Sequence, residues 1–171
     1  MKTLIISSSL SPNSKSFVLC KKVNQKLKDR GIQTELIDAR KIILNPYHIT
    51  KTKDMEDLSN KISLADNYII GMGVHNYSIN DSLKIILDNC FKNVDGKFFG
   101  IVCAGGGEKS YLSTMHLSQM CMNEWKMIQL PRTVYASRND FKNNEITSKQ
   151  VLEWMSLFCD EFAKIGLKLI S

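Results

Sequence analysis

The chain has 171 residues, a formal net charge of +6, a hydrophobic fraction of 43% and a charged fraction of 23%. This composition is that of an ordinary globular protein, and it excludes intrinsic disorder, collagen and coiled-coil fibres. No uncharged apolar run approaches the ~20 residues that a membrane span needs, and the apolar start Leu4–Ile6 is far too short for a secretion signal. The length predicts a single domain over residues 1–171.

The five cysteines are an odd number, and no two of them have the C-x-x-C spacing of a redox or metal motif. Because the sequence shows no secretion signal, we expect them to be reduced and mostly buried, which indicates a cytoplasmic location. The positive charge suits an anionic partner but identifies none, since Lys and Arg are spread along the chain without an arginine-rich tract. We therefore expect neither a nucleic acid nor a membrane as partner.

Short apolar runs alternate with longer amphipathic segments along the chain. Residues 3–7 form a run typical of a buried strand, and the polar residues 7–14 that follow have turn chemistry. A helix is predicted from there to about Asp29, with apolar residues on one face and Gly31 as its stop. The next predicted elements are a strand at 34–37, an irregular connection at 39–53 that contains Pro46, and a helix at 54–65.

The second half of the chain continues this alternation. Residues 68–72 predict a third strand, closed by Gly73, and residues 98–103 predict a fourth that runs into three glycines. Between them, apolar side chains recur at helical spacing: Ile79, Leu83, Ile86, Leu87 and Cys90. The remaining predictions are a methionine-rich helix at 110–124, a fifth strand at 127–134 interrupted or edged by Pro131, and a helix at 147–165. One stripe of that last helix is predicted to be core: Val151, Trp154, Met155, Phe158, Phe162 and Ile165.

The alternation of strands and helices predicts an α/β fold with a parallel sheet covered by helices on both faces, a three-layer sandwich. Right-handed crossovers leave few topologies, and five strands favour the flavodoxin-like order 2-1-3-4-5. In such sheets ligands bind outside the carboxyl ends of the strands, near the switch point between the first and third strands. Three loops of the sequence are expected at that edge.

The first of these loops carries hydroxyl groups and one ammonium at the start of a helix: Ser9, Ser11, Ser14, Lys15 and Ser16. Because the loop opens a helix, free backbone N–H groups and the positive end of the helix dipole face it. Together these groups indicate a phosphate site. The alternative is that Asn13 or Ser14 only caps the helix, although capping needs one such residue and not four serines and a lysine.

The second and third loops are candidates for holding a planar ring. The second comprises Gly73, Val74, His75, Asn76, Tyr77 and Ser78, and the third comprises Ala104, Gly105, Gly106 and Gly107. Glycine lets the backbone approach a ligand closely, and His75 and Tyr77 are suited to packing on an aromatic ring system. The alternatives are a solvent-exposed turn for the second loop and a flexible connector for the third.

Other motifs fail. Gly71 and Gly73 begin a dinucleotide fingerprint, but Asn76 stands in place of its third glycine, and no Walker P-loop is present. The first strand ends in serines, whereas a phospho-acceptor receiver needs acidic residues there. No His, Cys and carboxylate cluster has metal-ligand spacing, so no metal is expected. Cys103 is a candidate nucleophile, and an inert buried strand cysteine is the commoner alternative.

Several segments resemble the NADPH-dependent FMN reductases of flavodoxin-like fold, a family that includes quinone and azo-dye reductases. Residues 9–14 look like the family's phosphate loop G-S-x-R-x-x-S, residues 103–107 like its glycine-rich loop, and residues 139–147 like the polar connection before its last helix. The most specific segment is similar to T-P-x-Y-N-x-S-I…L-K-x-x-x-D and keeps register at Asn76, Ser78, Ile79, Leu83, Lys84 and Asp88. The departures are Ser8 for Gly, Ser11 for Arg, Gly73 for Pro and His75 for Tyr.

The resemblance implies FMN as cofactor, NAD(P)H as hydride donor and a small-molecule acceptor such as a flavin or quinone. It places the cofactor on the three loops, implies no certain catalytic side chain because FMN carries the chemistry, and leaves His75 as a candidate substrate contact. It also implies a homodimer or homotetramer. The alternatives are a flavodoxin-type electron carrier, a non-catalytic FMN-binding protein and a non-flavin interaction domain on the same fold. Electron-carrier flavodoxins are usually acidic, so the charge of +6 argues against the first of these.

Overall fold

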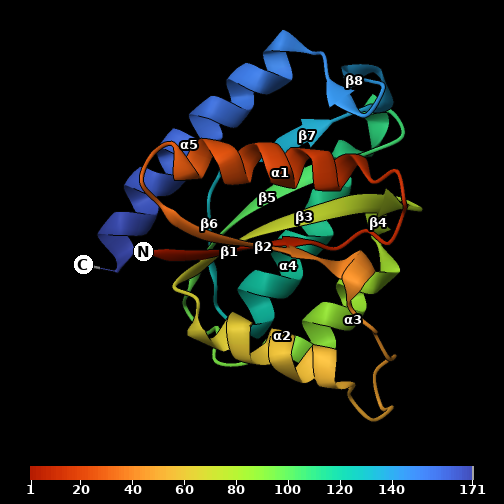
Figure 1. The fold of residues 1–171 in the computed structure, drawn as a ribbon, viewed down its shortest axis with the longest axis vertical. Coiled ribbons are helices and arrows are strands. Elements are labelled where there is room, and N and C mark those ends of the chain that lie inside the picture. The colour runs from red at the N-terminus through yellow and green to blue at the C-terminus, as the bar shows by residue number, and fades with distance from the viewer. Residues whose placement is uncertain (171) are drawn as a thin grey trace.

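The computed structural model describes residues 1–170 and has a mainly parallel β-sheet at its centre (Figure 1). Its strands are β1 (Lys2–Ser7), β2 (Gln33–Asp38), β3 (Asn67–His75), β4 (Ser78–Ile79), β5 (Phe98–Ala104), β6 (Ile128–Gln129) and β7 (Val134–Ala136). The order is β2-β1-β3-β5-β6, with β4 paired to β3 and β7 paired to β5. Because β6 and β7 both run parallel to β5, together they occupy the fifth position. The predicted order 2-1-3-4-5 is therefore confirmed.

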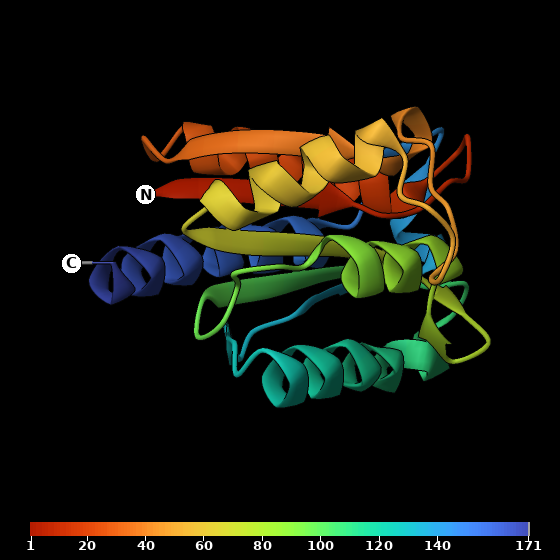
Figure 2. The ribbon, with the colours of Figure 1, turned by 90° about the horizontal axis from the view of Figure 1, so that it is seen from below.

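Two layers of helices cover the sheet. Helices α1 (Lys15–Lys28) and α5 (Lys149–Leu169) pack on one face, and α2 (Lys53–Leu64), α3 (Asp81–Cys90) and α4 (Thr114–Glu124) pack on the other. Figure 2, seen from below, has the second group in front of the sheet. Each face has its own apolar core, so the predicted three-layer arrangement is confirmed.

The helices begin where the sequence provides capping residues. Ser14, Thr52 and Ser148 are the N-caps of α1, α2 and α5, and each side chain accepts a hydrogen bond from the N–H three residues later. Gly31 follows the end of α1 with a φ of 73°, a left-handed conformation that glycine adopts without strain. These local signals explain why the predicted helix boundaries are close to the observed ones.

The last helix, α5, ends four residues later than predicted, and three other elements differ in form from the prediction. Strand β3 runs to His75 and not to Met72, because its end pairs with β4 in an antiparallel hairpin. The helix predicted from residue 110 begins as a 3₁₀ helix, η2 (Glu108–Ser113), before α4. The fifth strand is interrupted as predicted, since Pro131 has no N–H to donate, and pairing with β5 resumes at Val134.

The apolar stripe of α5 is only partly core. Val151, Met155, Phe158 and Phe162 are at most 2% exposed, but Trp154 is 38% exposed, so the prediction that it belongs to the core is wrong. Position 154 lies about 100° around the helix from Met155, at the margin of the buried stripe. There the indole borders a surface cavity.

A small hairpin joins β7 to α5. Strands β8 (Phe141–Lys142) and β9 (Glu145–Ile146) pair antiparallel, and the two turn residues between them, Asn143 and Asn144, have φ of 50° and 61°. Asparagine tolerates this left-handed conformation better than most residues, as two-residue hairpin turns require. The hairpin lies in the polar connection that the sequence predicted before the last helix.

All five cysteines are free and buried, as the sequence predicted. Burial raises the pKa of Cys20, Cys103 and Cys121 to about 12. These thiols therefore stay protonated at neutral pH, and Cys103 is a buried strand cysteine and not an activated nucleophile.

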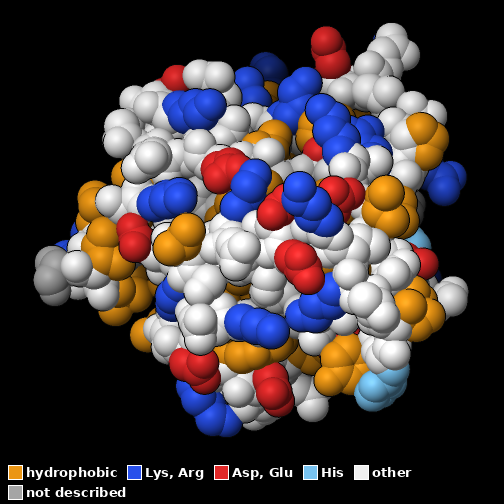
Figure 3. Space-filling view, turned by 60° about the horizontal axis from the view of Figure 1, so that its bottom comes forward, with side chains coloured by type: hydrophobic (Ala, Val, Ile, Leu, Met, Phe, Trp, Pro, Cys, Tyr) orange, Lys and Arg blue, Asp and Glu red, His pale blue; other side chains and the backbone are white. Residues whose placement is uncertain are grey.

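The surface carries charges of both signs. On the face seen in Figure 3, Lys and Arg side chains are interspersed with Asp and Glu, and hydrophobic side chains lie between them. Within residues 1–170, no helix combines the length and the apolar character needed to cross a membrane.

Candidate functional site

Three loops meet at one edge of the sheet. Strands β1, β3 and β5 are parallel neighbours, with Ser7 beside Gly71 and Gly71 beside Val102, so they end at the same side. We call the segments that leave them loop 1 (residues 8–14), loop 2 (residues 73–80) and loop 3 (residues 104–110). This edge lies at the right-hand end of Figure 2, away from the two chain termini.

Loop 1 ends in a helix cap. Ser14 Oγ accepts from the N–H of Phe17 at 3.0 Å and lies 3.0 Å from Ser16 Oγ, and both serines are buried. Ser9 and Ser11 are nearer to solvent, and Ser9 Oγ accepts from the N–H of Ser11 at 3.3 Å. The structure thus shows the cap at Ser14, while the hydroxyls of Ser9 and Ser11 are not used for capping α1.

The two cations nearest loop 1 have different partners. Lys15 Nζ donates to Asn144 Oδ1 at 2.7 Å and lies 5.4 Å from the Phe141 ring centroid, so this side chain is directed to the β8–β9 hairpin. Arg40 Nη1 instead donates to the carbonyl of Pro12 at 3.2 Å, and its guanidinium lies 4.1 Å from the Phe17 ring centroid. Nothing near Arg40 in the sequence indicates this contact with loop 1, because the residue lies in the 3₁₀ turn Ala39–Lys41 that follows β2.

Arg40 is paired with a carboxylate. Its Nε and Nη2 donate to the two oxygens of Asp38 at 2.8 and 2.7 Å, a bidentate arrangement. Hydrogen bonding from the guanidinium lowers the pKa of Asp38, more than burial raises it. The pair is therefore charged on both sides at neutral pH, and Arg40 is held with one N–H on loop 1.

Loop 2 is a β-hairpin. Val74 and His75 of β3 pair with Ile79 and Ser78 of β4, and the turn residues Asn76 and Tyr77 have φ of 49° and 60°. The tip is open to solvent, as the alternative of an exposed turn expects. Two side chains of neighbouring helices contact the hairpin: His75 Nδ1 lies 3.7 Å from Asp81 Oδ1, and Ser78 Oγ lies 2.9 Å from Nδ1 of His116 on α4.

Asn80 connects loop 2 to loop 1. This side chain is 1% exposed, and its Nδ2 donates to the carbonyl of Ser8 at 3.2 Å and to Ser82 Oγ at 2.8 Å. Its Oδ1 accepts from the N–H of Gly73 at 3.1 Å and lies 2.9 Å from Ser8 Oγ. Although Asn80 is the N-cap residue of α3, it makes no side-chain cap bond to that helix. Asn80 is not among the predicted site residues, and its only signal in the sequence is an Asn directly before a helix.

Loop 3 is held by residues from β7. The N–H of Gly105 donates to the carbonyl of Ala136 at 2.9 Å, and Tyr135 donates its hydroxyl to the carbonyl of Gly107. Ser110 Oγ lies 2.8 Å from the same hydroxyl. Partial burial raises the pKa of Tyr135, so its phenol is protonated at neutral pH. Tyr135 was also missed, because nothing near it in the sequence indicates a contact with the glycines.

Comparison with known proteins identifies relatives along most of the chain. The family model for NADPH-dependent FMN reductase matches residues 1–142. The FMN-dependent NADPH-azoreductase of Staphylococcus aureus is 28% identical over 156 residues, which cover 85% of this chain and 81% of that protein. Among solved structures, the apo form of an NADH:FMN oxidoreductase has a TM-score of 0.80 at 17% identity, covering 94% of this chain and 87% of that one. A Bacillus anthracis FMN-dependent NADH-azoreductase in complex with FMN has a TM-score of 0.67 at 18% identity, covering both chains fully.

The sheet order and the three loops at its carboxyl edge define a flavodoxin-like protein. Within that class, the chain belongs to the NADPH-dependent FMN reductase family, and the resemblance noted in its sequence is confirmed. It is accordingly an enzyme of the NAD(P)H-dependent FMN reductase type, with FMN and NAD(P)H as cofactors.

The residues of the three loops fit FMN. At one end, loop 1 offers the hydroxyls of Ser9 and Ser11 beside the first turn of α1, a donor set suited to a phosphate. At the other end, a Cβ added at Gly73, Gly106 or Gly107 would meet no atom within 4 Å. Open space therefore lies beside these three backbones, where a planar ring can approach without a side chain in its way.

Proposed function

We propose that the enzyme passes reducing equivalents from NAD(P)H to a small-molecule acceptor, such as a free flavin, a quinone or an azo compound. The observation that carries this proposal is the convergence of loops 1, 2 and 3 at one sheet edge, with open space beside Gly73, Gly106 and Gly107. The azo compound is included because the Staphylococcus aureus relative is named an azoreductase. The whole chain would serve as one FMN-binding domain.

In this proposal the residues of the three loops hold the cofactor. Its phosphate binds to loop 1 and the first turn of α1, where the candidates are Ser9, Ser11, Ser14, Lys15 and Ser16. Its ring lies between Gly73–Ser78 and Ala104–Gly107, with Asn80 holding the first of these segments against loop 1. FMN, when bound, supplies the hydride-transfer chemistry.

The proposal assigns the protein side chains to binding and orientation. His75 and Tyr77 lie at the exposed side of the hairpin, where they can border a second substrate. Cys103 remains a protonated, buried thiol. No step of the proposal needs a general acid or base from the loops, which supports a role for the chain in positioning the reactants.

The serine hydroxyls of loop 1 that do not cap α1 allow a direct test of the phosphate position. Ser14 is the helix cap, so replacing it would also fray α1, whereas Ser9→Ala and Ser11→Ala leave the cap intact. A hydrogen bond to a charged acceptor contributes about 1.5–3 kcal/mol, so FMN affinity is expected to fall at least ~10-fold for each change. Riboflavin has no phosphate, and its weaker binding is expected to stay the same. Flavin fluorescence measures both affinities.

The matched control is Ser63→Ala, which removes a hydroxyl that accepts from Asn93 at 3.1 Å near the end of α2. FMN affinity is expected to be unchanged in this variant. Unchanged FMN affinity in the double variant of Ser9 and Ser11 would contradict the placement of the phosphate. A visible spectrum with added FMN, followed by an NADPH-oxidation assay, separates a reductase from a flavodoxin-type carrier or a non-catalytic FMN-binding protein.

We also propose that the protein is a cytoplasmic homodimer or homotetramer. Its five buried free thiols support a reducing compartment. Large apolar side chains on η2 and α4 are exposed to solvent, among them Leu112, Met115 and Met122, and such a surface favours contact with a second copy. Sedimentation equilibrium measures the oligomeric state directly.

A further inference from the structure

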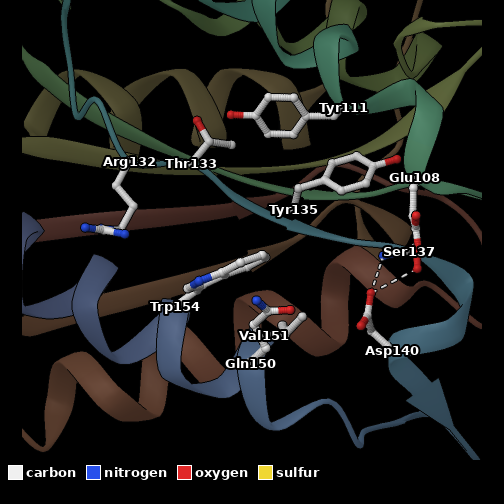
Figure 4. Close-up of a pocket in the computed structure, with 10 residues that line it drawn as sticks. All are labelled: Glu108, Tyr111, Arg132, Thr133, Tyr135, Ser137, Asp140, Gln150, Val151 and Trp154. Carbon is white, nitrogen blue, oxygen red and sulfur yellow. Dashed lines mark hydrogen bonds between the residues drawn. The ribbon is translucent and has the colours of Figure 1, made fainter.

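A cavity of about 570 Å³ opens beside loop 3, on the β7 side of the sheet (Figure 4). Loops 1 and 2 lie on the other side of β5, since β3 and β7 pair with opposite edges of that strand. The walls of the cavity come from η2, from the segment containing β7 and from the first turns of α5. We call it the Trp154 cavity, and its size is in the usual range of small-molecule sites.

Three aromatic rings face the Trp154 cavity. Figure 4 shows Tyr111, Tyr135 and Trp154 one below another, each from a different element. The two tyrosine rings meet edge to face, with centroids 5.6 Å apart. Tyr111 is 49% exposed and Trp154 is 38% exposed, so much of this aromatic surface is available to a ligand. Aromatic faces carry negative electrostatic potential and attract planar rings and cations.

The charges around the Trp154 cavity are acidic in balance. Glu108 and Asp140 border it, and Asp140 accepts from Ser137 N at 2.7 Å and from Ser137 Oγ at 3.0 Å. Among the lining residues that the structure describes, Arg132 is the only cation. Its guanidinium is already paired with Glu161 through bonds of 2.9 and 2.8 Å. Within residues 1–170, Glu108 and Asp140 therefore form no ion pair, although the net charge of the chain is +6.

We propose that the Trp154 cavity binds a planar aromatic cation. The rings of Tyr111, Tyr135 and Trp154 supply stacking and cation–π attraction, and the carboxylates of Glu108 and Asp140 add attraction for positive charge. An aromatic anion would gain the stacking but be repelled by both carboxylates. The inference does not rest on the flavin: among the cavity groups only Glu108 belongs to the three loops, and it follows the segment Ala104–Gly107 that is proposed for the ring.

The test uses the full-length protein and calorimetric titration with N-methylquinolinium, with and without saturating FMN. The cation is expected to bind with a stoichiometry of one, and about fivefold more tightly than quinoline, its neutral analogue at pH 8. Affinity for the cation is expected to fall about fivefold in Glu108→Gln, which removes one charge close to the ligand. Trp154→Leu removes one aromatic face and is expected to weaken binding by a similar factor.

Two matched controls are available. Glu56→Gln removes the same charge from an exposed position on α2, and Trp125→Phe changes the other tryptophan, which packs against Phe91. Neither change is expected to alter the affinity for N-methylquinolinium. Equal binding of quinoline, equal weakening by Glu56→Gln, or displacement of the cation by FMN would each overturn the proposal. If circular dichroism shows that Trp154→Leu does not fold, Tyr111→Leu on the exposed face of η2 provides the same test.

A protein that binds N-methylquinolinium but no FMN would keep this inference and refute the proposed flavin site. A protein that binds FMN but not the cation would refute this inference and keep the proposed flavin site. The two proposals can therefore fail separately.

Discussion

Replacing Asn80 with alanine is expected to lower the free energy of unfolding and to weaken FMN binding together. The change removes all four hydrogen bonds of this side chain, two of which join loop 2 to Ser8 of loop 1. Ser8 keeps other partners, because its hydroxyl also lies 2.8 Å from the carbonyl of Gly71 and its carbonyl still accepts from Ser82 Oγ at 2.6 Å. The N–H of Gly73 loses the partner that Asn80 provides.

The expected loss of free energy of unfolding follows from these broken hydrogen bonds. The N–H of Gly73 is partly buried, and a fully buried donor left without a partner costs about 1–3 kcal/mol; together with the lost bonds to Ser8 and Ser82, a total loss of about 2 kcal/mol is expected. For a chain of this length, that corresponds to a fall in melting temperature of about 4–8 °C. FMN affinity is expected to fall as well, because loops 1 and 2 are no longer held in register.

Urea unfolding followed by circular dichroism measures the stability, and flavin fluorescence measures the affinity. Ser82→Ala is the comparison within the network, since the carbonyl of Ser8 then keeps Asn80 as its donor, and a smaller loss is expected. Asn60→Ala, at an exposed position on α2, is the matched control and is expected to be close to neutral. If Asn80→Ala were as stable as the parent protein and bound FMN equally well, the assigned role of Asn80 would be wrong.

Three further predictions concern other parts of the fold. Gly106→Val is expected to abolish FMN binding while the melting temperature stays unchanged, because a Cβ at this position meets no atom within 4 Å. By contrast, Gly100→Ala is expected to lower the melting temperature, because its Cβ would lie 2.6 Å from Phe158 Cζ. Hydrogen bonding to Arg40 lowers the pKa of Asp38 in the folded protein. The stability that the ionised Asp38 contributes is therefore complete above the ordinary carboxyl pKa of about 4, and it is lost as the pH falls through the lower pKa of the folded state. Asp38→Asn is therefore expected to flatten the acid limb of the stability curve measured by urea unfolding, and an unchanged limb would contradict this. Because the three loops border one edge, NADPH and a quinone are expected to bind in turn and give parallel double-reciprocal lines, whereas intersecting lines would indicate a ternary complex.

Most helix boundaries were predictable because they depend on local signals, and the strand order was predictable because right-handed crossovers leave few topologies for five strands. The caps Ser14 and Ser148 and the left-handed Gly31 act within a few residues of the elements that they delimit. The β3–β4 hairpin was not predicted, because its turn places Tyr77 at a φ of 60°, a conformation that a bulky side chain rarely adopts. The sequence indicated an exposed turn here only as an alternative, and the stability of the hairpin depends on the pairing of β3 with β4.

The three loops of the candidate site were predictable as segments, but the residues that hold them together were not. Asn80 reaches Ser8 across 72 positions of the sequence, and Tyr135 reaches Gly107 across 28. Arg40 reaches Pro12 from the end of a different strand. Such contacts depend on how the sheet brings strand ends together, and a reading of local pattern contains no information about them.

An open sheet has two edges at which a neighbouring or partly folded chain can add a strand. At one edge, β6 has two residues and β7 has three, and Pro131 between them offers no N–H, so an incoming strand finds no continuous ladder. The other edge is β2, whose six residues form an uninterrupted ladder with β1. There the ion pair of Glu35 with Lys61, at 2.7 Å, opposes strand addition but leaves the ladder continuous. Aggregation by strand addition is therefore expected to proceed through β2, and the split fifth strand protects its own side of the sheet.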